Sequence, residues 1–276
     1  MIGWWQAAVL GMLQGLTEFL PISSSAHLRI AAPLLGWSDP GAAFTAVTQL
    51  GTETAVLLYF RRDIWTILRT WTLSLGRPQL RADPAARMGW YVIFGTVPIV
   101  VLGFALRGLI ETSFRDLRII AVTLIVFGLV LGAADAVARN VRPLEKLTLR
   151  HGLIYGLAQA LALVPGVSRS GGTISAGLLL GYRREAAARY AFLLAIPAVL
   201  ASGIFELRLI GEGSAPAWGP TLLATVLAFA VGYVVIAWLL RYLAHGSFRP
   251  FVIYRVALGI LLLGLVVGGV LDPLPH

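Results

Sequence analysis

A carboxylate, a run of hydroxyls and an imidazole lie within ten residues of each other near the start of the chain, in the segment QGLTEFLPISSSAH. Gln14 and Glu18 are four residues apart, so on a helix they lie on the same face. Pro21 ends that helix, serines fill the turn, and His27 follows. These residue types can act as acid–base groups and as a nucleophile. One serine is also expected to cap the next helix, which does not exclude chemistry at its neighbour.

A second segment, PGVSRSGGT at residues 165–173, is suited to binding phosphate. Its proline–glycine pair turns the chain, and its two later glycines let the backbone approach a ligand closely. Arg169 supplies positive charge, and the following helix presents its N-terminal N–H groups. Hydroxyls come from Ser168, Ser170 and Thr173. The alternative is that Arg169 only pairs with a carboxylate such as Glu18, but the glycines and hydroxyls favour a phosphate site.

Three further polar residues lie in or beside apolar runs, where such groups are costly and point to function. Gln49 and Glu53 are four residues apart, again on one helix face, and are candidates to line the same cavity. For Glu53, a local pair with an arginine is an equally good interpretation. Arg255 begins the last apolar run, from which it reaches either the lipid headgroups or the site.

The elements that position these residues follow from the composition. The chain has 276 residues, of which 58% are hydrophobic and only 13% charged, and its mean hydropathy is +0.83. Soluble domains carry about 25% charged residues, and disorder needs the opposite composition. The absence of cysteine excludes a disulfide-stapled scaffold. The sequence therefore predicts an all-α integral membrane protein in a lipid bilayer.

About six transmembrane helices are predicted, each long enough to cross a hydrocarbon core of about 30 Å. The apolar runs are residues 43–60, 88–106, 119–138, 222–240 and 251–271, with a shorter one at 190–205. Two other apolar regions, 2–35 and 153–180, are interrupted at the two motifs. Interrupted segments are typical of re-entrant helices, whose irregular backbone lies inside the protein or lines a cavity.

The two interruptions resemble each other. Each places a glutamine six or seven residues before a proline that is followed by a hydroxyl-rich turn. Such a pair predicts two repeats, at about 1–117 and 140–276, within one polytopic membrane domain that covers 1–276. Chance similarity of two proline–serine turns is the alternative.

The distribution of basic residues gives the orientation and argues against a nucleic-acid partner, despite a net charge of +9. Fifteen of the 22 basic residues lie in segments 61–87, 139–150, 183–189 and 241–249. Only five lie on the other side, namely Arg29, Arg107, Arg115, Arg118 and Arg208. Cytoplasmic loops are rich in Lys and Arg, so the first set is predicted to be cytoplasmic and both termini outside. The repeats then have inverted topology.

Both motifs resemble those of the bacterial undecaprenyl-pyrophosphate phosphatases, the BacA or UppP family linked to bacitracin resistance, and the resemblance covers essentially the whole chain. The family's first motif is Glu or Gln, then Glu after three residues, then a Ser–Ser pair and a histidine. Here these are Gln14, Glu18, Ser23, Ser24 and His27. The second motif, Pro-Gly-x-Ser-Arg-Ser-x-x-Thr, matches residues 165–173 at every defined position.

The resemblance implies hydrolysis of undecaprenyl diphosphate to the monophosphate, which recycles the lipid carrier of peptidoglycan synthesis. It implies a bacterial inner-membrane enzyme whose site opens to the periplasmic side, with Mg or Ca and no organic cofactor; a homodimer is a further expectation. Many members have Glu at position 14, so Gln14 removes one candidate metal ligand. Glu18, with the phosphates of the substrate, remains able to hold one Mg²⁺.

We take the following roles as a hypothesis. The expected catalytic residues are Glu18, Ser24, His27 and Arg169, and the expected substrate-binding residues are Gln14, Ser23, Gln49, Ser168, Ser170, Thr173 and Arg255. Ser24 is the preferred nucleophile, with His27 and Glu18 as acid–base partners. A nucleophilic His27 and a water activated by Glu18 remain open.

Two rival functions belong to other classes. A polyprenyl-phosphate transporter or flippase fits the residue pattern almost as well, because inverted repeats with broken helices are common in transporters. A lipid phosphatase of the phosphatidic-acid phosphatase type shares only a Ser–Arg pair, and its downstream histidine–aspartate signature is not found in this sequence.

Overall fold

The computed structural model describes residues 2–111, 114, 116–207, 210 and 217–274, and within these ranges the regular structure is helical with no strand. The α-helices are α1 (Trp4–Thr17), α2 (Ser24–Leu34), α3 (Gly41–Tyr59), α4 (Arg61–Gly76), α5 (Pro84–Ala105), α6 (Arg107–Glu111), α7 (Leu117–Val137), α8 (Leu149–Ala160), α9 (Arg169–Leu179), α10 (Arg184–Glu206), α11 (Trp218–Leu243) and α12 (Arg249–Val267). Short 3-10 helices are η1 (Pro78–Ala82), η3 (Leu144–Lys146) and η4 (Leu161–Leu163).

Among the described helices, α5, α7, α10, α11 and α12 are long and apolar enough to cross a membrane, by length and composition. This agrees with the predicted all-α integral membrane protein. The remaining predicted span is α3, which has 19 residues and is therefore about 28 Å long at 1.5 Å per residue. It is less apolar because it carries Gln49, Glu53 and four threonines. A sixth span at α3 stays a prediction.

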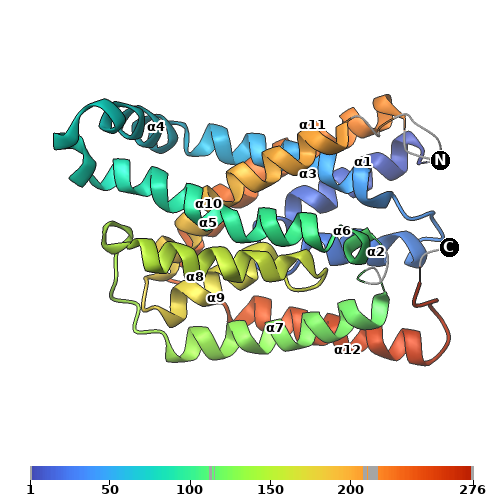
Figure 1. The fold of residues 1–276 in the computed structure, drawn as a ribbon. Helices are drawn as coiled ribbons and strands as arrows, with labels where there is room; N and C mark the ends of the chain where they lie inside the picture. Colours follow the sequence, from blue (N-terminus) through green and yellow to red (C-terminus); the bar gives the residue numbers. More distant parts are fainter. Residues whose placement is uncertain (1, 112–113, 115, 208–209, 211–216, 275–276) are drawn as a thin grey trace.

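The basic segment 61–87 contains a helix that the sequence analysis missed. It is α4, whose Trp65 and Leu68 side chains are exposed. The segment mixes arginines with apolar residues at helical spacing, which is the pattern of an amphipathic helix. In Figure 1, α4 lies beside the start of α5, at the end of the molecule opposite the two termini.

The two predicted sets of basic residues belong to opposite ends of the helix bundle. Both termini lie at one end in Figure 1, while α4 and the connection from α7 to α8 lie at the other. The second end carries the segments 61–87 and 139–150 of the larger set. Arg115 and Arg208 of the smaller set lie outside the described residues.

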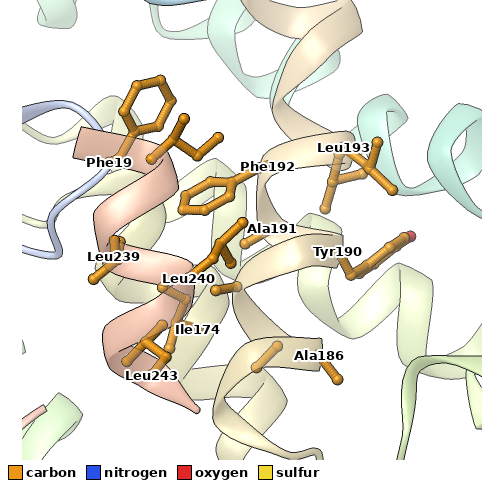
Figure 2. Close-up of a cluster of buried hydrophobic side chains, with 14 of the residues drawn as sticks. Phe19, Ile174, Ala186, Tyr190, Ala191, Phe192, Leu193, Leu239, Leu240 and Leu243 are labelled. Atoms are coloured by element: carbon orange, nitrogen blue, oxygen red, sulfur yellow. The ribbon is translucent and has the colours of Figure 1, made fainter. Parts of the chain in front are cut away.

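The core links the first interrupted region to helices from the second half of the chain. Helix α11 packs on both α1 and α3, and α12 packs on α7. Figure 2 shows Phe19, just after α1, beside Phe192 of α10 and near leucines of α11. The two phenylalanine rings meet edge to face, with centroids 5.4 Å apart. This packing holds the first interruption against the helices around the second one.

Candidate active site

The chain breaks its helices at both predicted places. The first break, residues 18–23, separates α1 from α2, and the second, residues 161–168, separates α8 from α9. In Figure 1, α1 and α2 form a hairpin that starts from the end with the termini, whereas α8 and α9 form one that starts from the opposite end. Thus both breaks lie inside the bundle.

A serine in a left-handed backbone conformation ends each break. Ser23 has φ 74° and Ser168 has φ 70°, and among the described non-glycine residues only Asn140 also has a positive φ. Such a conformation costs about 1–3 kcal/mol and is concentrated at functional sites. Each of the two serines is the N-cap of the helix that follows. Two helix N-termini are therefore formed by the same strained turn.

The side chains of the two caps also bond alike. Ser23 Oγ accepts a hydrogen bond from the Ala26 amide at 3.4 Å, and Ser168 Oγ accepts one from the Gly171 amide at 3.1 Å. The serine two positions later contacts each cap, through Oγ–Oγ distances of 3.3 Å and 3.2 Å. Free N–H groups at a helix N-terminus attract anions, so two such termini in one site suit a phosphate group.

The breaks contact each other directly. The Gly166 amide donates to Ser23 Oγ at 3.2 Å, and Ser170 Oγ donates to the Leu20 carbonyl at 3.2 Å. Gly166 has φ 93°, and a Cβ there would collide with Thr123 Oγ1 of α7. A residue with a side chain would therefore be strained at this turn and would also be blocked by α7.

Arg255 of α12 joins the same two breaks from the side. Its Nη1 donates to the Pro21 carbonyl at 3.1 Å, and its Nη2 donates to the Gly166 and Val167 carbonyls at 2.8 Å and 3.0 Å. The residue is 0% exposed. Gly171 leaves room for it, because a Cβ there would lie 2.6 Å from Nη1. The arginine expected at the headgroups or the site thus holds the backbone of both breaks.

Glu18 is the centre of the site. Its Oε2 accepts hydrogen bonds from Ser24 Oγ at 2.5 Å and from Gln14 Nε2 at 2.8 Å, and its Oε1 pairs with Arg169 Nη2 at 3.0 Å. The same Nη2 donates to Gln49 Oε1 at 3.3 Å. Five predicted site residues from three separate segments are therefore brought together. The ion pair that the sequence left as an alternative role of Arg169 is present.

His27 points to a residue that the sequence analysis missed. Its Nδ1 lies 2.7 Å from the Ser23 carbonyl oxygen, and its Nε2 lies 2.7 Å from Tyr254 Oη. The two rings are stacked, with centroids 5.6 Å apart. The Ser24 hydroxyl donates to Glu18 and not to the imidazole. The only signal for Tyr254 in the sequence was its position directly before Arg255 in the last apolar run.

The remaining predicted hydroxyls have partners within the protein. Thr173 is fully buried, and its Oγ1 donates to the Arg169 carbonyl at 2.7 Å. Ser168 and Ser170 make the cap and break contacts described above. These bonds fix the first turn of α9, which begins at Arg169. Direct contact of the three hydroxyls with phosphate stays a prediction.

Glu53 lies beside this network. The residue is 4% exposed, and its Oε1 has no hydrogen-bond partner in the described part of the chain. It interacts electrostatically with Arg169 and with Glu18. Glu53 is thus close enough to the predicted site to interact with the charges of both Arg169 and Glu18.

The Glu18 carboxylate is engaged mainly by donors from the protein itself. The three donors described above already occupy both Glu18 oxygens, and a carboxylate offers about four lone-pair positions. Gln14 turns its amide N–H, not its oxygen, toward Glu18. No cluster of three or more His, Cys, Asp or Glu side chains with the geometry to hold a metal occurs among the described residues.

The arrangement has the parts of a phosphoryl-transfer site. A serine hydroxyl donates to a partly buried carboxylate, which can accept its proton and so activate it as a nucleophile. A guanidinium and two helix N-termini provide positive potential where anionic oxygens would lie.

Comparison with known proteins gives the family. Residues 7–261 match the family described as bacitracin resistance protein BacA. "Undecaprenyl-diphosphatase 2" of Frankia casuarinae is 64% identical over 99% of this chain and 98% of its own length. The protein of the same name from Streptomyces coelicolor is 60% identical over 99% and 98%, and "Undecaprenyl-diphosphatase" of a Nocardioides species is 60% identical over 98% and 99%. The chain belongs to the bacitracin resistance protein BacA family.

Proposed function

We propose that this protein hydrolyses undecaprenyl diphosphate to undecaprenyl phosphate and inorganic phosphate. The observation that carries the proposal is the Ser24–Glu18–Arg169 arrangement at two helix N-termini. The names of relatives that are 60–64% identical over nearly the whole chain support this substrate. The product is the lipid carrier of peptidoglycan synthesis, and its recycling accounts for resistance to bacitracin.

In the first half of the reaction, the terminal phosphate binds between the N-termini of α2 and α9. Its oxygens take over the Arg169 guanidinium from Glu18, which leaves Glu18 free to accept the Ser24 proton. Ser24 Oγ then attacks the terminal phosphorus, and the bond from phosphorus to the bridging oxygen breaks. Undecaprenyl phosphate leaves with that oxygen, and phosphoserine remains. Most of the rate enhancement comes from positioning and from charge stabilisation by Arg169 and the helix N-termini.

In the second half, water attacks the phosphorus of phosphoserine and the phosphorus–Oγ bond breaks. Ser24 Oγ takes its proton back from Glu18, and inorganic phosphate leaves. Ser24 is favoured over His27 as the nucleophile because both imidazole nitrogens already have partners. The short bond from Ser24 to Glu18 supports the same assignment.

The membrane placement is part of the proposal. The hairpins α1–α2 and α8–α9 are re-entrant, α3 is a sixth span, and the segments 1–117 and 140–276 are inverted repeats. The end with both termini faces the periplasm of the inner membrane, because the larger basic set belongs to the opposite end. Any divalent cation arrives with the diphosphate, since the donors around Glu18 leave little room for a resident ion.

The test is phosphate release from undecaprenyl diphosphate by the purified protein in detergent, with Ser24→Ala as the inactive control. Hydrolysis with a trapped phosphoserine supports the proposal. If the protein releases no phosphate but moves polyprenyl phosphate across vesicle membranes, the transporter is correct and the phosphatase is not. Phosphate release with a trapped phosphohistidine would instead move the nucleophile to His27.

A further inference from the structure

We propose that Tyr254 is a catalytic residue of this site, which holds the His27 imidazole in place and relays a proton between it and the attacking water. Neither motif contains Tyr254, and α12 brings it to His27 across 227 residues of sequence. The inference deepens the proposed phosphatase function, on which its kinetic part rests.

The tautomer follows from the two partners of the ring. A carbonyl oxygen only accepts hydrogen bonds, so Nδ1, which lies 2.7 Å from the Ser23 carbonyl, carries the proton. In the neutral imidazole Nε2 is then unprotonated and accepts from the Tyr254 hydroxyl at 2.7 Å. The stacked rings leave little freedom for the imidazole to turn. Tyr254 therefore fills the one nitrogen at which His27 can gain a proton.

Tyr254 lies closer to the surface of the helix bundle than His27 does. His27 is only 8% exposed, whereas Tyr254 is 44% exposed. The neighbouring Arg255 holds α12 to both breaks through three carbonyls. Because the two residues are adjacent on one helix, the bonds of Arg255 also fix the position of Tyr254 relative to the first break.

This geometry gives His27 a task apart from Ser24. When water attacks phosphoserine, the water proton moves to Tyr254 Oη while the Tyr254 hydroxyl proton moves to His27 Nε2. The imidazolium that forms keeps Nδ1–H on the Ser23 carbonyl and now donates Nε2–H to Tyr254. Once phosphate has left, the two transfers reverse, and a water molecule that enters the emptied site takes up the proton. No oxidant or further reactant is required.

The variant Tyr254→Phe keeps the ring and removes only the hydroxyl. Positioned proton transfer contributes about 10²–10⁴-fold to rate, so a partial loss of about 10- to 100-fold in kcat is expected, with KM changed less than about threefold. In ¹⁵N NMR spectra of histidine-labelled protein, the wild-type His27 should show the Nδ1–H tautomer with a hydrogen-bonded Nε2, and the variant should keep Nδ1–H but lose the shift of Nε2 that this hydrogen bond causes. The chain has four histidines, so the signal is assigned with His27→Gln.

A control exists outside the site, where α8 begins. His151 Nδ1 lies 2.7 Å from Tyr182 Oη, so Tyr182→Phe removes a similar hydroxyl from a similar pair outside the site. This variant should keep kcat within about twofold of wild type and leave the His27 signal unchanged. Thermal unfolding of each variant checks that it is folded.

The inference is overturned if Tyr254→Phe keeps both the wild-type kcat and the wild-type His27 signal. A changed Nε2 signal with unchanged kcat limits Tyr254 to holding the imidazole in place and overturns the proton transfer. The NMR result does not depend on turnover. A wild-type protein that releases no phosphate therefore refutes the proposed function, while the tautomer is still tested.

Discussion

The two breaks have the same backbone conformation at their caps but carry different side chains. Each ends in a left-handed serine cap that is contacted by a second serine two positions later. The residue directly after the cap is Ser24 in the first break and Arg169 in the second. Four positions after the cap, the first break has His27 and the second has Gly172. One turn thus presents a nucleophile and an imidazole, and the other presents a cation.

The difference shows which side chains are present for chemistry. A cation at a helix N-terminus is electrostatically unfavourable, yet Arg169 is the first residue of α9. Its partner is a carboxylate from the other break. A charge that is unfavourable on its own helix, and that is compensated only by a residue on the other side of the site, is typical of a group that binds a ligand there. The serine caps, by contrast, do the same structural work in both breaks.

The largest effect is expected from removing the cation. Arg169→Ala should lower phosphate release by at least about 10³-fold, because an arginine that stabilises phosphoryl transfer contributes about that much. The protein should remain folded in detergent. Arg118→Ala, which removes an arginine paired with Asp116 near the start of α7, is the control. Near-normal hydrolysis by the Arg169 variant would refute the phosphate clamp.

Removing the nucleophile should have a similar or slightly smaller effect. Ser24→Ala is expected to abolish the phosphoserine intermediate and to lower kcat by about 10³-fold or more. Ser25→Ala, one residue later in the same turn, removes only the contact with Ser23 Oγ and should retain most activity. Turnover of the Ser24 variant within tenfold of wild type would favour water activated by Glu18.

Arg255 tests whether both breaks depend on one clamp. Arg255→Met keeps the length of the side chain but leaves three carbonyls without their donor. Each unsatisfied buried group costs about 1–3 kcal/mol, so unfolding in denaturant should begin at clearly lower concentration and activity should fall. Arg249→Met, at the exposed start of α12, is the matched variant. Unchanged stability of the Arg255 variant would contradict the clamp.

The smallest expected effects are on stability, and they distinguish the two serine caps. Glycine tolerates the left-handed conformation and replaces a serine cap at a cost of only a few tenths of a kcal/mol. Ser168→Gly should therefore be nearly neutral. Ser23→Gly should cost about 1 kcal/mol more, because Ser23 Oγ also accepts from the Gly166 amide of the other break. Equal unfolding curves for the two variants would show that this contact between the breaks contributes nothing.

Much of the fold was predictable because it rests on local patterns. Length and hydropathy predicted the helices α5, α7, α11 and α12 to within four residues at each end, whereas α10 begins six residues before the predicted run. Proline and serine signals predicted both breaks. Helix α4 was missed because its apolar residues are interspersed with arginines, threonines and a serine in a segment assigned by charge. The amphipathic period was present in that segment and was outweighed by the charge count.

The contacts of the site also fall into those that local spacing predicts and those that only distant packing determines. The i,i+4 spacing placed Gln14 beside Glu18, and that bond is present. Arg169 as the partner of Glu18 was one of two interpretations, because local spacing does not tell which of several carboxylates a distant arginine meets. Arg255 as a clamp and Tyr254 as the partner of His27 depend on contacts across more than 200 residues.

The sequence by itself determined what can bind and react. It shows an apolar chain with two polar helix breaks, one with Glu18, Ser24 and His27 and the other with Arg169. Only the tertiary structure decided which atoms face each other: Ser24 toward Glu18, and His27 toward Tyr254. The physical reason is that secondary structure follows from neighbours a few residues apart, whereas a catalytic set is assembled by packing helices that are distant in sequence.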